Sequence, residues 1–284
     1  MVAAKDIMKT TYAKVDMNDT VSDLQGKLRL KKQTFAVVFD GKKYKGIAGR
    51  RWLLTSRVDT SKTRIRNLTK KSSKRGNPFF VPKLSPSDDI AKVCRLLANA
   101  DTRALPVLDK QKVVGVVTAR SVMRKIKSEY KGIPVKELAK KKLVSLKLND
   151  TVGDAIKTMN RSKVDRLPIV DRFGKIAGIV TEFDILRRFH RYPATSRRTP
   201  SAMSHDSWSG PMGSADEKQK MVGLPVDNIM TPYPMVVTAD MGSTIAAVID
   251  IMIKDDVNSV ILVDDSRPAA MLTVKDVLDD YSRG

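Results

Sequence analysis

Residues 178–184 read Gly178-Ile179-Val180-Thr181-Glu182-Phe183-Asp184, a short apolar run that ends in a threonine and an aspartate three positions apart. The pattern predicts a strand that runs through a small residue into a turn and then a helix. Three further stretches end in a similar way: Gly46-Ile47-Ala48-Gly49-Arg50-Arg51-Trp52, Gly115-Val116-Val117-Thr118-Ala119-Arg120-Ser121 and Ala270-Met271-Leu272-Thr273-Val274-Lys275-Asp276. An ending that recurs four times indicates a repeated structural unit.

Each ending closes a longer common pattern. Each unit contains a helix with apolar residues at i, i+3, i+4 and i+7, upstream of the ending. These residues are Val21/Leu24/Gln25/Leu28 (with Gln25 as a polar exception), Ile90/Val93/Cys94/Leu97, Val152/Ala155/Ile156/Met159 and Ile245/Val248/Ile249/Met252. A buried strand follows at 36–39, 105–108, 167–170 and 260–263, before the strand of the ending. We therefore expect a mixed α/β fold whose unit is strand, helix, strand, strand, helix, with Cys94 in a core.

The composition is typical of a cytoplasmic globular protein. No stretch approaches the roughly 18 continuous apolar residues of a membrane helix. Residues 1–9 include Lys5 and Asp6 where a signal peptide would have its apolar run. The single cysteine excludes an intramolecular disulfide. We expect no membrane association and a cytoplasmic location.

The net charge of +22 is unevenly distributed. Residues 1–132 hold 31 Lys and Arg against 11 Asp and Glu, a net charge of +20, whereas residues 133–284 carry only +2. This asymmetry favours a polyanionic partner for the first half, such as nucleic acid, an acidic protein or an anionic lipid face. A lysine-rich solvated surface is the alternative.

The candidate anion-binding patch consists of Lys70, Lys71, Lys74, Arg75, Arg50 and Arg51. Only 5% of the chain is aromatic, so stacking platforms for bases are scarce. Nucleic acid would therefore bind through its backbone, with weak sequence preference and a steep dependence on salt.

Catalysis is not expected. The only histidines are His190 and His205, which together with one core cysteine supply neither an ordinary zinc site nor a Cys–His pair. The sequence also lacks the Gly-x-x-x-x-Gly-Lys phosphate loop and the Gly-x-Ser-x-Gly nucleophile elbow. We expect a protein with no obligatory cofactor and no metal.

With its closing Gly-h-h-Thr-x-x-Asp (h is apolar), the repeated unit resembles the cystathionine-β-synthase (CBS) domain. The third copy fits best, because Val164-Asp165-Arg166-Leu167-Pro168-Ile169-Val170-Asp171 leads into the stretch 178–184. The resemblance covers residues 2–58, 64–128, 133–189 and 223–282. Between the last two copies lies a serine- and proline-rich insertion, 190–222, which is either a surface insertion or a lid or docking loop.

Four copies in one chain resemble the gamma subunit of AMP-activated protein kinase and stand-alone prokaryotic relatives. The resemblance implies that the copies pair into two Bateman modules, which form a flat disc with ligand clefts facing its centre. The disc could be a monomer or a homodimer.

In the family, the closing aspartate accepts hydrogen bonds from ribose hydroxyls and the threonine contacts phosphate. The matching residues here are Thr181 with Asp184 and Thr273 with Asp276. The chemistry is reasonable in itself, because a carboxylate accepts both hydrogens of a cis-diol and a helix N-terminus favours phosphate. However, Thr-x-x-Asp at a helix start is also a capping box that needs no ligand.

The resemblance implies further ligand contacts. By position, Val144-Ser145 and Val237-Thr238 would line the adenine pocket. Arg166 either meets a phosphate or pairs with a surface carboxylate. The first two copies depart from the pattern, with Gly49 and Trp52 in one and Ser121 for the aspartate in the other. Ribose binding is therefore expected in the second half.

The expected function is that of a non-catalytic sensor. It would bind AMP, ADP, ATP or S-adenosylmethionine as a regulatory ligand at the third and fourth copies and pass the signal to an unknown effector protein. Two alternatives remain at this point: nucleic-acid binding through residues 1–132, and a scaffold that binds no ligand.

Overall fold

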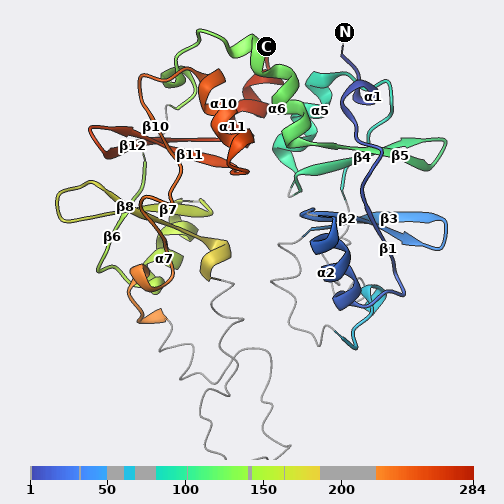
Figure 1. Cartoon of the computed structure of the whole chain (residues 1–284), viewed down its shortest axis with the longest axis horizontal. Coiled ribbons are helices and arrows are strands. Elements are labelled where there is room, and N and C mark those ends of the chain that lie inside the picture. Colours follow the sequence, from blue (N-terminus) through green and yellow to red (C-terminus); the bar gives the residue numbers. More distant parts are fainter. Residues whose placement is uncertain are drawn as a thin grey trace, which may run out of the picture. The chain divides into compact units, whose positions relative to one another are not determined.

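A computed structural model describes residues 2–31, 33–49, 61–67, 81–100, 102–139, 143–162, 164–185 and 222–284 (Figure 1). The chain forms two compact units. Unit 1 consists of Met1–Ala139, Gly242–Val260 and Leu272–Gly284, and unit 2 of Lys140–Met241 and Ile261–Met271. Both units are therefore discontinuous in sequence: two C-terminal segments belong to unit 1, and the short segment between them belongs to unit 2. The insertion 190–222 lies outside the described residues, apart from its last position.

The described elements follow the expected order in each repeat, and the repeats are numbered here 1 to 4 along the chain. Repeat 1, after the short helix α1 (Ala4–Ile7), contains β1 (Ala13–Asp16), α2 (Val21–Leu30), β2 (Phe35–Asp40) and β3 (Lys43–Gly49). Repeat 2 contains α5 (Ile90–Asn99), β4 (Ala104–Asp109), β5 (Lys112–Thr118) and α6 (Ala119–Ile126), which runs into the 3-10 helix η1 (Lys127–Tyr130). Leu84, which bridges Val107 in parallel, takes the place of a first strand in repeat 2.

Repeat 3 is preceded by η2 (Val135–Glu137) and contains β6 (Leu146–Lys147), α7 (Val152–Ser162), β7 (Arg166–Val170) and β8 (Ile176–Thr181). A helix begins at Glu182, directly after β8. Repeat 4 is preceded by η3 (Val226–Asn228) and β9 (Thr231–Pro232) and contains β10 (Thr238–Asp240), α10 (Ile245–Lys254), β11 (Ser259–Asp264), β12 (Arg267–Thr273) and α11 (Val274–Tyr281). The mixed α/β class is therefore confirmed.

The same strand arrangement recurs from repeat to repeat. The first strand pairs in parallel with the second in repeats 1, 3 and 4, because a helix connects them. The second pairs antiparallel with the third in repeats 1, 2 and 3. These three antiparallel pairs each have an irregularity at the same place, after Val38, Val107 and Ile169. The predicted strands were correctly placed but one residue too short at several ends.

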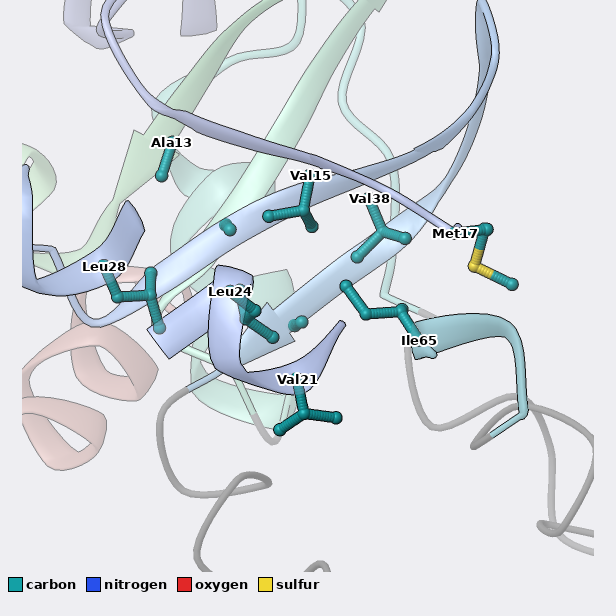
Figure 2. Packing of buried hydrophobic residues seen from close by; sticks show 10 residues of the cluster. Ala13, Val15, Met17, Val21, Leu24, Leu28, Val38 and Ile65 are labelled. Atoms are coloured by element: carbon teal, nitrogen blue, oxygen red, sulfur yellow. The ribbon is translucent and has the colours of Figure 1, made fainter. Parts of the chain in front are cut away.

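The apolar faces predicted for the helices are buried. In repeat 1, Val21, Leu24 and Leu28 of α2 pack over β1 and β2, against Val15 and Val38 (Figure 2). Cys94 on α5 is fully buried, as expected for a core residue, and burial raises the pKa of its thiol to about 12. Ile156 of α7 is only partly buried and packs at the margin of its cluster.

A backbone bridge clamps the N-terminus of the first helix in every repeat. In repeat 1, Val21 N–H donates to the carbonyl of Thr63, and Ile65 N–H donates to the carbonyl of Asp19, at 3.0 Å in both cases. The equivalent bridges join Ile90 to Val2, Ala4 to Asp88, Ile245 to Ile133, Val135 to Ser243, Val152 to Leu224 and Val226 to Asp150. Each bridge satisfies an N–H group that a helix cannot satisfy itself.

These bridges establish which repeats pair. The stretch of chain before the first strand of a repeat is called here its entry segment. The entry segment of repeat 1 bonds to the helix of repeat 2, and the entry segment of repeat 2 bonds to the helix of repeat 1. Repeats 3 and 4 exchange their entry segments in the same reciprocal way. The residues that insert from the four entry segments are fully buried: Ala4, Ile65, Val135 and Val226.

The glycine of the recurring ending allows a close crossing of chains. A Cβ at Gly178 would lie 2.5 Å from the sulfur of Met230 and 2.8 Å from the carbonyl oxygen of Thr231. A Cβ at Gly115 would likewise lie 2.6 Å from the sulfur of Met8. The entry segment of the partner repeat thus crosses the third strand at a point where a side chain would collide with it.

Within unit 1, the helices α10 and α11 of repeat 4 lie beside α5 and α6 of repeat 2 (Figure 1). The buried Tyr130 donates its hydroxyl hydrogen to Asp280 at 2.9 Å, and Tyr281 donates to Glu129 at 2.9 Å. Lys127 pairs with Asp250 at 2.8 Å. Repeats 2 and 4 are therefore joined by polar contacts as well as by helix packing.

Candidate functional site

The threonine and aspartate of the recurring ending cap the helix that follows. Thr181 N–H donates to Asp184 Oδ2 at 2.9 Å, and the Thr181 hydroxyl donates to the same oxygen at 2.6 Å. Asp184 N–H in turn donates to Thr181 Oγ1 at 3.2 Å. Thr273 and Asp276 have the same three bonds at the same distances. The capping role proposed for these residues is thus present in both repeats.

The cap leaves half of the Asp184 carboxylate available. Both hydrogen bonds from Thr181 reach Oδ2, and no hydrogen bond from another residue in the described part of the chain reaches Oδ1. Asp184 is half-buried, so this oxygen belongs to a partly desolvated side chain beside a helix N-terminus. An oxygen of this kind accepts hydroxyl hydrogens strongly, because the bond is charge-assisted.

Repeat 2 keeps the cap but loses the charge. Ser121 Oγ accepts from Thr118 N–H at 3.1 Å and donates to the Thr118 carbonyl at 2.8 Å. A hydroxyl that already donates and accepts in this way offers no carboxylate oxygen to a diol. In repeat 1, Gly49 ends β3, and Trp52 lies outside the described residues.

Arg166 pairs with its neighbour in the sequence. Its Nε donates to Asp165 Oδ1 at 2.8 Å and its Nη2 donates to Oδ2 at 3.0 Å, a bidentate ion pair. The Arg166 side chain is 16% exposed and that of Asp165 is 50% exposed. The pair with a carboxylate, one of the two roles considered for Arg166, is thus present in the structure, and the contact with a phosphate stays a prediction.

Arg166 and Thr181 lie on the same face of their sheet, because they are directly opposed in the antiparallel pair β7/β8. Ile179, two residues before Thr181, packs against a cluster in unit 2 that includes Val236 and Ile261 from repeat 4. Val237 follows Val236, and its carbonyl accepts the Ile261 N–H at 3.3 Å. Within unit 2, the end of β8 in repeat 3 and the segment Val237-Thr238 of repeat 4 thus lie near the same contact between two sheets.

The other candidate residues are placed as follows. Val144 packs against the apolar cluster around α7, whereas Ser145 is exposed just before β6. Both belong to unit 2, whereas Thr273 and Asp276 belong to unit 1. The six residues of the anion-binding patch lie outside the described residues: Arg50, Arg51, Lys70, Lys71, Lys74 and Arg75.

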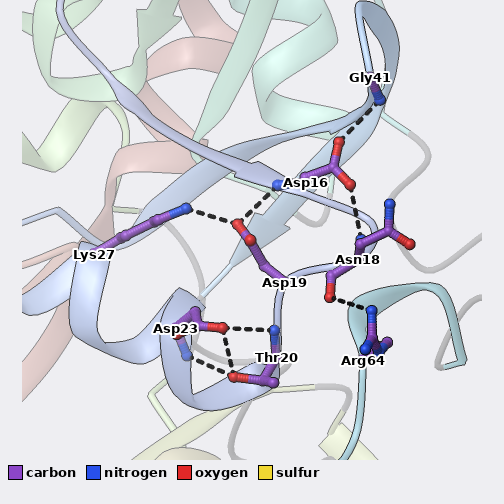
Figure 3. Close-up of polar contacts among 8 residues, drawn as sticks. All are labelled: Asp16, Asn18, Asp19, Thr20, Asp23, Lys27, Gly41 and Arg64. Atoms are coloured by element: carbon purple, nitrogen blue, oxygen red, sulfur yellow. Dashed lines mark hydrogen bonds and ion pairs between the residues drawn. The ribbon is translucent and has the colours of Figure 1, made fainter.

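Some basic residues of repeat 1 are neutralised within the fold. In the loop that leads into α2, Asp19 Oδ2 accepts Asp16 N–H at 2.9 Å and pairs with Lys27 at 2.6 Å (Figure 3). The N–H groups of Asn18 and Gly41 donate to Asp16 and lower the pKa of that carboxyl. Asp40 pairs with Lys45 and lies 3.8 Å from Arg66. Other basic residues of the same repeat are exposed, among them Arg29, Lys31, Lys42 and Lys43.

Among the described residues, no group of three or more His, Cys, Asp or Glu side chains is placed to hold a metal ion. In the same ranges, no helix has the length and apolar character needed to cross a membrane.

Comparison with known proteins identifies the repeated unit. The sequence profile of the CBS domain matches residues 80–128, 135–191 and 226–283. The chain belongs to the CBS-domain family. This confirms the resemblance drawn from the recurring ending. The profile match does not include residues 2–79, but repeat 1 has the strand pairing of repeat 3 and exchanges its entry segment with repeat 2.

Curated relatives match this chain over part of their length. The uncharacterized protein MJ1232 of Methanocaldococcus jannaschii is 33% identical over 104 residues, which are 37% of this chain and 34% of that protein. The inosine-5'-monophosphate dehydrogenase of Korarchaeum cryptofilum is 27% identical over 188 residues, 65% of this chain and 33% of that enzyme. The chain therefore spans about a third of the length of these two relatives.

Two solved structures share the fold along the whole chain. Protein MJ1225 from Methanocaldococcus jannaschii, described as a proposed archaeal homologue of gamma-AMPK, has a TM-score of 0.68 and 18% identity and covers 99% of this chain and 100% of its own. A conserved protein from Pyrococcus horikoshii has a TM-score of 0.61 and 20% identity, with the same coverage. At these identities the similarity concerns the fold alone.

Proposed function

We propose that this CBS-domain protein is a non-catalytic sensor that binds an adenosine-containing ligand and passes the signal to a partner protein. The observation that carries the proposal is the Asp184 carboxylate, of which Oδ2 caps a helix while Oδ1 accepts no hydrogen bond within the described part of the chain. The binding site would consist of Thr181 and Asp184, with Val237 and Thr238 beside the adenine.

The ribose is the part of the ligand that this carboxylate fits. A cis-diol presents two hydroxyl hydrogens, and a hydrogen bond to a charged group contributes about 1.5–3 kcal/mol. Asp184 is held in one position by its own cap, so little side-chain freedom is lost when a ligand binds. The serine of repeat 2 has no charge to offer, which favours the second half of the chain as the place of binding.

Repeat 4 supplies a second candidate site. Thr273 and Asp276 repeat the cap of Thr181 and Asp184 bond for bond. Asn258 and Ser259 stand where repeat 3 has Asp165 and Arg166, so we propose that this second site lacks the charged pair of repeat 3.

The size of the ligand bounds its affinity. About 23 non-hydrogen atoms in a mononucleotide, at roughly 0.3 kcal/mol each, give about −7 kcal/mol. This corresponds to a dissociation constant on the order of 10 μM. Such a site would respond to changes in ligand concentration in the cytoplasm, as a sensor requires, rather than hold a permanent cofactor.

The test is the thermal stability of the whole chain with a panel of adenosine, S-adenosylmethionine, AMP, ADP and ATP. A ligand at about 100 times its dissociation constant stabilises the folded state by about 2.7 kcal/mol. In a protein of this size that raises the melting temperature by roughly 5–10 °C. If none of the five compounds shifts the transition, the sensor proposal fails and the ligand-free scaffold takes its place.

A second candidate function rests on the net charge of +20 in residues 1–132. We propose that this half binds the backbone of a nucleic acid through Lys70, Lys71, Lys74, Arg75, Arg50 and Arg51. Exposed Arg29, Lys31, Lys42 and Lys43 would add to the attraction. An acidic protein would use the same charge, and competition with heparin and with duplex DNA separates the two partners.

A further inference from the structure

We propose that the Asp165–Arg166 ion pair sets the ligand class of the repeat 3 site, so that it prefers adenosine ligands without a 5′-phosphate. Such ligands are neutral nucleosides or cationic sulfonium nucleosides. This inference rests on the proposed function, because it concerns the specificity of the same site.

The first argument is the state of the guanidinium. Two donors of Arg166, Nε and Nη2, are engaged by the two oxygens of Asp165 in the fork geometry that an arginine also uses for phosphate. Arg166 is directly across from Thr181 in β7/β8 and on the same face of the sheet. A phosphate would have to displace this carboxylate, and the positive charge that should attract it is already compensated.

The second argument is the state of the helix N-terminus. A helix start attracts phosphate through backbone N–H groups that have no partner inside the helix. At this start, Thr181 N–H donates to Asp184 Oδ2 and Asp184 N–H donates to Thr181 Oγ1. Glu182 N–H donates to the carbonyl of Asp165 at 2.8 Å. Three of the first four N–H groups are therefore used by the protein itself, and within the described part of the chain only Phe183 N–H is left for a ligand.

The third argument is charge. Asp165 cancels Arg166, and Asp184 adds a carboxylate that the ribose needs. These three side chains together carry a net negative charge, which repels a dianionic phosphate, leaves a neutral nucleoside unaffected and attracts a sulfonium group. The ribose contact is the same for all these ligands, so the ion pair discriminates among them.

The ion pair distinguishes repeat 3 from repeats 2 and 4. In each of these repeats, the first N–H group of the closing helix donates to a backbone carbonyl just before the second strand. The carbonyl belongs to Arg103 in repeat 2, Asp165 in repeat 3 and Asn258 in repeat 4, so these three positions are equivalent. The residues that follow these three positions are Ala104, Ser259 and Arg166. Of these three repeats, only repeat 3 therefore has an acidic residue followed by an arginine at these positions.

The experiment is calorimetric titration of the full chain with adenosine, S-adenosylmethionine and AMP, in an Asp276→Ala background that confines binding to repeat 3. We expect adenosine and S-adenosylmethionine to bind at least about tenfold more tightly than AMP. Asp165→Asn should shift this ratio by about tenfold in favour of AMP. The matched control is Asp227→Asn, which removes an exposed carboxylate elsewhere in unit 2 and should leave the ratio unchanged.

The double variant Asp165→Asn/Arg166→Gln separates the proposal from a direct phosphate contact, because it removes both charges of the pair and leaves the net charge of the site unchanged. If Arg166 binds phosphate, this variant loses AMP affinity selectively; the proposal expects the ratio of AMP to adenosine to stay within about threefold of that of the parent chain. Tighter binding of AMP than of adenosine by the parent chain, or an unchanged ratio in Asp165→Asn, would overturn the inference while leaving the adenosine site in place. Absence of binding by all three ligands would overturn the inference, and absence of binding by ADP and ATP as well, in the parent chain, would overturn the proposed function.

Discussion

Asp184 Oδ2 accepts two hydrogen bonds from Thr181, one from the backbone N–H at 2.9 Å and one from the hydroxyl at 2.6 Å. This arrangement reconciles the two roles considered for the recurring ending. One carboxylate oxygen stabilises the helix start, and the other is the acceptor on which the proposed ligand contact depends. The cap is thus a means of orienting the acceptor.

The close crossing at Gly178 predicts a strong effect of a single methyl group. Gly178→Ala should lower the free energy of unfolding by about 1–3 kcal/mol, because Met230 and the Thr231 carbonyl occupy the space of the new Cβ. The matched control is Gly26→Ala, in the interior of α2 with nothing within 4 Å of the added Cβ. It should raise stability by about 0.5–1 kcal/mol. Urea unfolding measures both, and equal effects would contradict the crossing.

The exchanged entry segments predict that a residue outside the predicted helices and strands is important for the core. Ile65→Ala should cost about 2–5 kcal/mol in the free energy of unfolding, since Ile65 is fully buried against α2 and β2. Leu30→Ala removes the same amount of side chain at a site that is 81% exposed and should change stability by less than about 0.5 kcal/mol. Similar losses in both variants would mean that Ile65 is not part of the core.

The loop before α2 predicts a loss of stability in acid. Hydrogen bonds from Asn18 and Gly41 lower the pKa of Asp16, and bonds from Thr20 lower the pKa of Asp23, both from 3.8. A carboxyl with a lowered folded-state pKa stabilises the fold above its unfolded-state pKa, and this contribution is lost as pH falls through the folded-state value. The unfolding free energy should therefore decline below about pH 4, and less steeply in Asp16→Asn. Parallel pH profiles of the parent chain and the variant would contradict this role.

The basic half predicts binding that depends steeply on salt. A complex with duplex DNA should form at about 50 mM salt and be largely lost by about 200 mM. Reversing the charges of Lys70, Lys71, Lys74 and Arg75 should weaken it about uniformly across DNA sequences. A gel shift that persists unchanged in this variant would place the contact elsewhere.

The sequence predicted the repeated unit well because its signals are local. The apolar faces of α2, α5 and α10 follow from spacing alone and are buried as expected. The strands before each ending are also buried, except at their last predicted residues Phe39, Leu108, Val170 and Val263, which are partly buried. The exchange of entry segments was not predicted, because it consists of backbone hydrogen bonds that leave little trace in side-chain type. A weak signal exists in the pair Ile7-Met8, which recurs as Ile229-Met230 in the segments that cross Gly115 and Gly178.

The residues of the candidate site were predicted less completely. Thr181 and Asp184 follow from the motif, and so does the possibility of a cap. The choice of Arg166 between a phosphate and a carboxylate depends on its side-chain conformation, which spacing does not determine. Asp165 stands beside Arg166 in the sequence, but neighbours in a strand usually point to opposite faces, so its bidentate contact could only be found in the structure.

The central claim is that Asp184 binds an adenosine ligand, and calorimetric titration of two matched variants tests it most directly. Asp184→Ala and Asp154→Ala each remove the aspartate of a threonine–aspartate cap in repeat 3, but only Asp184 belongs to the proposed site. Asp154→Ala should bind the preferred ligand like the parent chain, whereas Asp184→Ala should bind it at least about tenfold more weakly. Equal affinities in the two variants, with both folded, would contradict the claim.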